Sequence, residues 1–193
     1  ANPTTPAISS NNSNGTGILN IGDGATLTVK GNVRQGNANW TINKDCTINF
    51  EHASANLTWA ITDDGGTSTN AILILNGTSG HRITVASTGA ANSGGFGNVG
   101  TAWSLGGKIQ ASYVSFSKIG TSTLPMLTFR GGTSAYTGFF DNCLITDCGK
   151  IYSSHNVAAG ATVRFRQTSF KGTPASSDGR VIELSLAAGT HTG

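Results

Sequence analysis

Three segments in the second half of the chain can be laid over one another so that their inward-type residues coincide. Phe116, Ile145 and Phe170 mark the same position in the three copies, at offsets of 29 and 25 residues. The copies span residues 108–120, 136–149 and 162–172, and their other matched positions are Ile109/Gly138/Val163, Ala111/Phe140/Phe165 and Val114/Cys143/Thr168. A strand-rich unit that repeats at this interval cannot bury its apolar face alone. The repeat therefore predicts a solenoid.

Most other apolar segments alternate with polar residues at the period of a β-strand. This alternation occurs in residues 25–29, 40–42, 46–50, 57–61 and 83–85, and further strands are expected at 71–75 and 181–186. The same period turns Trp40 and Trp59 toward the interior. No segment shows helical periodicity, so an all-β fold is expected.

Two segments lack any periodicity. Residues 1–15 predict a flexible N-terminal arm. Residues 87–102 are rich in Gly, Ala and Asn and predict a long loop without secondary structure, which is either functional or a lid. The chain therefore divides into an arm, 1–15, and one domain, 16–193.

The composition suits many short strands joined by tight turns. The chain of 193 residues contains 27 glycines, and only 11% of it is charged, against about 25% in an average globular chain. The net charge of +3 is dispersed, whereas nucleic-acid-binding proteins concentrate Lys and Arg along one face. No apolar run is long enough to span a bilayer. We expect neither nucleic-acid binding nor membrane insertion.

The three cysteines are interpreted as small buried hydrophobes. Cys46 and Cys143 share the period of their inward neighbours, and Cys148 takes the position that Ile119 occupies one repeat earlier. A metal site would need further ligands close to them, and none of the four histidines has a partner at a metal-like spacing. We therefore expect no metal and no cofactor.

Three phrases of the sequence carry a family resemblance. They are residues 19–29 (LNIGDGATLTV), 82–87 (RITVAS) and 113–120 (YVSFSKIG). With short strands, frequent turns and copies at 25–29 residues, the chain resembles the right-handed parallel β-helices of the pectin-lyase-like superfamily. The resemblance is greatest to the solenoids of bacteriophage tail spikes and tail fibres. It implies a single right-handed parallel β-helix of about six to seven coils over residues 16–193.

This resemblance favours a phage-type virion or tail-fibre protein. Such a protein would bind a host-surface glycan, or rigidly position the part that does, and would be located in the virion or at a cell surface. An alternative is a structural spacer or surface adhesin module. Trp103, at the end of the 87–102 loop, is a candidate platform for stacking on a sugar, with plain packing as the other interpretation.

A second alternative is a polysaccharide hydrolase or lyase. Polygalacturonase-type β-helices use an Asp pair and a Ser/Gly-Gly-His stretch on successive coils, and Asp63, Asp64 and His81 resemble that set in order and spacing. One carboxylic acid would protonate the leaving oxygen while a carboxylate activates water. However, the Asn-Thr-Asp and Arg-Ile-Lys elements of that family are missing here. Asp63 and Asp64 also precede a Gly pair, where Asp is a common turn former.

Outward-facing residues of the middle copy predict assembly. Phe139 and Leu144 stand where the flanking copies carry polar residues. Two outward apolar side chains on one coil suggest contact with the 87–102 loop or with another chain, as in a homotrimer or a complex with other virion proteins. Asp141 and Arg166 also align outward on neighbouring copies, which predicts a cross-strand ion pair.

Overall fold

The computed structural model describes residues 8–9, 18–35, 38–51, 57–61, 71–88, 94–97, 108–120, 125–130, 137–155, 162–172 and 182–186. All regular secondary structure in these ranges is β-strand, which confirms the all-β prediction for them. Within the same ranges there is consequently no helix that could cross a membrane.

Nineteen strands in the described ranges form three parallel sheets, and each sheet takes every third of these strands. Sheet A contains β1 (Ile8–Ser9), β4 (Val33–Arg34), β7 (Thr58–Ala60), β10 (Gly95–Gly97), β13 (Leu127–Arg130), β16 (Ile151–His155) and β19 (Ile182–Leu186). Sheet B contains β2 (Ile18–Ile21), β5 (Asn39–Asn43), β8 (Ile72–Asn76), β11 (Lys108–Ser112), β14 (Thr137–Asp141) and β17 (Thr162–Arg166). Sheet C contains β3 (Thr26–Val29), β6 (Thr47–Phe50), β9 (Ile83–Ser87), β12 (Val114–Ser117), β15 (Leu144–Thr146) and β18 (Ser169–Lys171).

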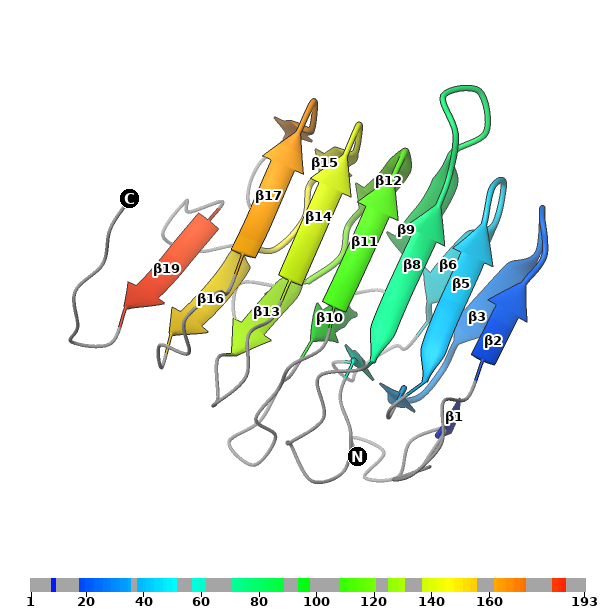
Figure 1. The fold of residues 1–193 in the computed structure, drawn as a ribbon, viewed down its shortest axis with the longest axis horizontal. Helices are drawn as coiled ribbons and strands as arrows, with labels where there is room; N and C mark the ends of the chain where they lie inside the picture. The colour runs from blue at the N-terminus through cyan, green and yellow to red at the C-terminus, as the bar shows by residue number, and fades with distance from the viewer. Residues whose placement is uncertain are drawn as a thin grey trace.

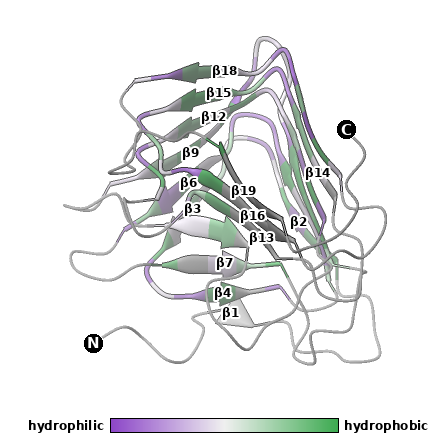
Figure 2. Ribbon diagram, turned by 90° about the vertical axis from the view of Figure 1, so that its left-hand side faces the viewer, coloured by the Kyte–Doolittle hydropathy of each residue, from purple (hydrophilic) through white to green (hydrophobic). Residues whose placement is uncertain are grey.

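Three consecutive strands, such as β10, β11 and β12, thus contribute one strand to each sheet, and we call such a set a triplet. Successive triplets lie side by side along the long axis of the molecule (Figure 1). Seen from the side, the three sheets surround a common interior (Figure 2). This arrangement is consistent with a β-helix or solenoid.

The register between triplets agrees with the alignment of the three sequence copies. Phe116 pairs with Ile145, which pairs with Phe170 in sheet C. In sheet B the paired sets are Ile109–Gly138–Val163 and Ala111–Phe140–Phe165. These pairings confirm the positions matched in the sequence, because a slip of one residue would turn every inward side chain outward.

The interior is filled by the inward residues of all three sheets, and aromatic rings run through it. Trp40 and Trp59 meet edge to face, with ring centroids 5.4 Å apart, and both are buried as predicted. The ring contacts continue from Trp59 through Phe96, Phe116, Phe140 and Phe165 to Phe170, with centroid separations of 5.7, 6.3, 6.3, 5.1 and 5.5 Å. Such pairs stabilise the core by about 0.5–1.5 kcal/mol each beyond the area they bury.

The prediction that residues 87–102 lack secondary structure is wrong for one short part of this segment. Residues 95–97 form β10, which pairs with β7 and β13 in sheet A. Phe96 is buried among the other aromatic rings, but its glycine neighbours hid the alternation that marks a strand. Of the predicted arm, residues 1–15, the structure describes only β1, which pairs with β4.

Candidate functional site

At three consecutive corners between sheets B and C, one residue turns the chain with a positive φ. Tyr113, Asn142 and Gln167 have φ values of 51°, 55° and 50°. Side chains other than those of Asn and Asp seldom adopt this left-handed conformation. The N–H of Tyr113 donates to the carbonyl of Asp141 at 3.0 Å, and that of Asn142 to the carbonyl of Arg166 at 2.8 Å. The corners therefore stack through backbone hydrogen bonds.

The connection between β8 and β9 departs from this pattern and forms a small hairpin, residues 77–82, which projects beyond the end of β8 (Figure 1). Thr78 and His81 exchange N–H···O bonds of 3.0 and 3.1 Å. Gly77 lies so close to the neighbouring corner that a Cβ there would be 2.5 Å from the carbonyl oxygen of Tyr113. Glycine is therefore needed for this approach.

His81 links the hairpin to the preceding triplet. Its Nδ1 lies 2.9 Å from Oδ2 of Asp45, the corner residue between β5 and β6, and both side chains are about half exposed. The Ser79–His81 stretch that the sequence suggests as catalytic thus forms the tip and end of this hairpin. Asp63 and Asp64 lie outside the described residues, so the proposed catalytic set stays a prediction.

Arg82 links the hairpin to the two following triplets. Its Nε donates to Oγ of Ser115 at 3.0 Å, and its Nη2 donates to the carbonyl of Asn142 at 2.7 Å and more weakly to that of Val114 at 3.4 Å. The guanidinium carbon also lies 5.9 Å from the centroid of the Tyr113 ring. This long side chain is therefore held across two corners, with its charge fixed in place.

Beside Arg82 the corner surface is hollowed into a groove of about 400 Å³. The groove is lined by Arg82, Tyr113, Ser115, Asn142, Cys143, Leu144, Gln167 and Ser169. Four of the eight lining residues are Ser, Asn or Gln, a tyrosine and a leucine add apolar surface, and Arg82 supplies the only charge of this lining. Such a surface suits a hydroxylated ligand with a polar edge and an apolar face.

The sequence does not predict the groove: of its residues, Leu144 is expected as an interface residue and Cys143 as a buried hydrophobe. The sequence did contain a signal for the position of the corners. Inward residues are separated by two positions within a strand, but by three positions from Ala111 to Val114 and from Phe140 to Cys143. The extra residue is the one with positive φ. Arg82 had no such signal, because its contacts come from triplets far ahead in the sequence.

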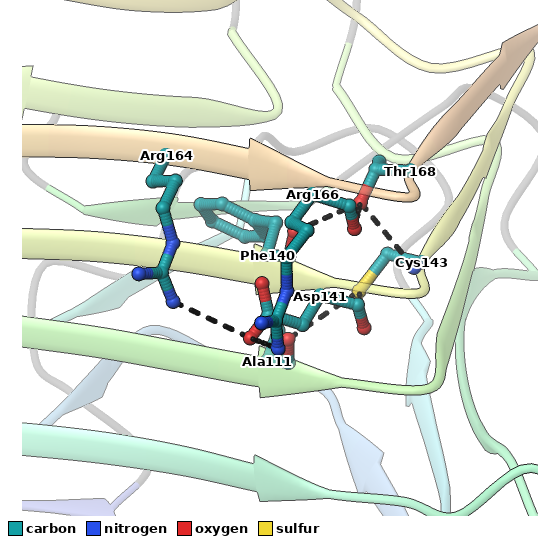
Figure 3. Close-up of polar contacts among 7 residues, drawn as sticks. All are labelled: Ala111, Phe140, Asp141, Cys143, Arg164, Arg166 and Thr168. Carbon is teal, nitrogen blue, oxygen red and sulfur yellow. Dashed lines mark hydrogen bonds and ion pairs between the residues drawn. The ribbon is translucent and has the colours of Figure 1, made fainter.

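A second polar cluster lies on the outer face of sheet B. Asp141 Oδ2 accepts from Arg166 Nη2 at 2.9 Å and from Arg164 Nη2 at 3.4 Å (Figure 3). The pair with Arg166 confirms the predicted cross-strand ion pair. The Arg164 guanidinium carbon also lies 4.4 Å from the ring centroid of Phe139. This arrangement joins two strands of sheet B and leaves Phe139 only partly exposed.

The thiols are structural, as the sequence suggests. Cys143 Sγ contacts the carbonyl oxygen of Ala111 at 3.5 Å, and Thr168 at the matched position donates its hydroxyl to the carbonyl of Phe140 at 2.9 Å (Figure 3). Cys46, Cys143 and Cys148 are all buried and unbridged. Burial raises the pKa of Cys143 and that of Cys148 to about 11, so both remain neutral thiols near pH 7.

Of the remaining predicted site residues, two lie in the described part of the chain and one does not. Phe139 and Leu144 face outward as expected, on different sheets, since each is less buried than the inward residue that follows it. Trp103 lies outside the described residues. Within the described part of the chain, no three His, Cys, Asp or Glu residues are grouped so that they could hold a metal ion.

Comparison of the chain with protein-family models gave no match, and comparisons with curated proteins and with solved structures gave no significant match. Function is therefore inferred from the residues that line the groove.

Proposed function

We propose that the chain is a right-handed parallel β-helix of about six to seven coils that acts as a phage-type virion or tail-fibre component. It binds a host-surface glycan, or positions the part that does. The groove at the corner between sheets B and C is the observation that supports glycan binding. The proposal of a single helix is supported by sheets of seven, six and six parallel strands that share one hydrophobic core.

The groove continues into a column of small hydroxyl side chains along sheet C. The column follows the strand register through Thr26, Thr47, Thr84, Ser115, Leu144 and Ser169. None of these residues is charged, and neighbouring strands bring them to a spacing of about 4.8 Å. A glycan chain lying along the column would find a hydrogen-bonding side chain on most strands, with Tyr113 available to apolar sugar faces.

The test is incubation of the purified protein with candidate capsular and lipopolysaccharide glycans, followed by chromatography of the glycans. The proposal expects retention of an intact glycan by the folded protein. Conversion to short fragments would instead establish an enzyme and direct mutation to Asp63, Asp64 and His81. If every glycan passes unretained and unchanged, the structural spacer or adhesin interpretation replaces ours.

Assembly into a homotrimer, or with other virion proteins, is part of this proposal. Phe139 and Leu144 support it as outward apolar side chains on consecutive strands of sheets B and C. The molar mass measured by light scattering at micromolar concentration should correspond to three chains. A mass equal to one chain would contradict the homotrimer.

A further inference from the structure

We infer that the groove takes an acidic saccharide and that Arg82 pairs with its carboxylate. The inference rests on the proposed function, because it names the class of glycan that this same groove would bind. It depends on the charge of Arg82, on the bonds that hold its guanidinium, and on the absence of acidic groups among the groove residues.

Arg82 brings a positive charge that no carboxylate neutralises among the described residues. The ion pairs in that part of the chain join Lys30 to Glu51, Lys44 to Asp23, and Arg164 and Arg166 to Asp141, while Asp45 contacts His81. Asp141, next to the corner residue Asn142, is engaged by its two arginines. An anionic ligand in the groove would therefore meet an uncompensated cation and no acidic lining residue.

The guanidinium retains donors for a ligand. Its bonds to Ser115, Val114 and Asn142 use Nε and Nη2, while Nη1 makes no hydrogen bond to any described residue. The existing bonds hold the guanidinium in one orientation, so little side-chain entropy remains to be lost on binding. A carboxylate can accept an N–H group of Nη1 in a charge-assisted hydrogen bond.

The remaining lining suits a sugar ring. Ser115, Asn142, Gln167 and Ser169 offer hydroxyl and amide groups that both donate and accept, as sugar hydroxyls do. The groove is shallow and open to solvent, with a volume of about 400 Å³, so a saccharide would lie along the surface and expose part of itself to water. A carboxylate-bearing saccharide therefore matches both the charge and the neutral polar surface.

The experiment compares matched ligands on the unmodified protein. Isothermal titration is run with hyaluronan oligosaccharides, which carry glucuronate, and with oligosialic acid. Each is also tested after chemical reduction of its carboxylates to alcohols, and maltooligosaccharides serve as neutral ligands. We expect at least one acidic oligosaccharide to bind and its reduced form to bind about tenfold more weakly or worse.

Two variants assign that preference to the groove. Arg82→Gln removes the charge at the groove and should abolish the difference between the acidic and reduced ligands. Lys118→Gln is the matched control, because it removes one exposed charge at the far end of β12, outside the groove, and should leave the preference unchanged. If Arg82→Gln fails to fold, the comparison of acidic and reduced ligands on the unmodified protein decides.

The outcomes separate this inference from the function on which it rests. Equal binding of acidic and reduced ligands, or binding of maltooligosaccharides alone, overturns the acidic specificity and leaves glycan binding standing. An acidic preference that persists in a folded Arg82→Gln variant overturns the role of Arg82. Failure of the folded protein to bind any of these saccharides, acidic or neutral, contradicts this inference, whereas the proposed function is decided separately by the chromatography of capsular and lipopolysaccharide glycans.

Discussion

Two kinds of corner between sheets B and C meet at the candidate site, and the difference between them locates it. At Tyr113, Asn142 and Gln167 a single residue with positive φ turns the chain. The strands before these corners, β11, β14 and β17, pair in continuous parallel register. Between β8 and β9 the hairpin of residues 77–82 replaces this one-residue turn. The hairpin adds the side chain of Arg82, which lines the groove together with the three regular corner residues.

This contrast shows how a repetitive fold acquires a specific site. The backbone hydrogen bonds of a regular corner are satisfied by the next corner, which leaves little that distinguishes one triplet from another. The hairpin contacts the triplet before it through His81 and two triplets after it through Arg82. One irregular connection therefore couples four neighbouring triplets and places a charge among neutral side chains.

The largest expected effect on the unfolding free energy comes from ionising the buried thiols. One of them, Cys143, directly follows the regular corner at Asn142. Burial raises the pKa of Cys143 and Cys148 from 9.0 to about 11. Thiols of the unfolded chain ionise first, so their contribution to stability is complete below pH 9 and is lost as pH rises toward 11. We expect the unfolding free energy to fall by on the order of 2 kcal/mol per thiol at pH 11, measured by urea unfolding between pH 8 and 11.

The control for this prediction uses residues that the fold already accepts. Cys143→Thr introduces the residue found at matched position 168, where the hydroxyl donates to the carbonyl of Phe140. Cys148→Val introduces a β-branched apolar residue, like Ile119 one triplet earlier. The double variant should remain folded at pH 8 and lose part of the decline between pH 9 and 11. An identical decline in both proteins would show that other groups cause it.

The next effect tests the close approach of the hairpin to the regular corner. In Gly77→Ala the new Cβ would meet backbone carbonyl oxygens of Tyr113 and Ser112 at 2.5 and 2.9 Å, so the backbone must move. We expect a loss of about 1–3 kcal/mol in urea unfolding. Gly80→Ala, in the same hairpin, has nothing within 4 Å of its Cβ and should change stability by less than about 0.5 kcal/mol. Equal losses in the two variants would contradict the close contact.

Much of the fold follows from the sequence where connections between triplets have similar lengths. In the second half, Phe116, Ile145 and Phe170 occur at nearly equal intervals, and their alignment correctly predicts the strand register. In the first half, Leu27 and Ile48 occupy the same column of sheet C at less regular spacing. Connections of variable length hide the repeat there, although pairing in space is just as regular.

The candidate site was less predictable, because it depends on contacts between triplets. Outward Leu144 could be recognised from the alternation of its strand, and the pair of Asp141 with Arg166 from the alignment of copies. Nothing local in the sequence reveals that Arg82 reaches Asn142, 60 residues further along the chain. His81 was recognised as a chemically interesting residue, but its contact with Asp45 depends on how the hairpin folds back.

A smaller effect is expected from the ion pairs that flank the regular corners. Asp141→Asn keeps the shape of the side chain and removes the charge that faces Arg164 and Arg166. Both arginine side chains are more than half exposed, so water can solvate them in the variant. We expect a loss of about 0.2–1 kcal/mol in urea unfolding that shrinks at 1 M NaCl. A larger loss that is independent of salt would assign Asp141 a packing role instead.

The smallest effect compares two regular corners directly by exchanging their residues. Asn tolerates a positive φ better than Gln, because its short polar side chain interacts locally with the backbone. Asn142 and Gln167 have φ values of 55° and 50°, so the same preference applies at both corners. Gln167→Asn should therefore raise the unfolding free energy by up to about 0.5 kcal/mol, and Asn142→Gln should lower it by a similar amount. Thermal unfolding of the two variants beside the unmodified protein measures both changes. Shifts of the same sign would mean that groove contacts of these side chains, and not backbone conformation, decide which residue each corner accepts.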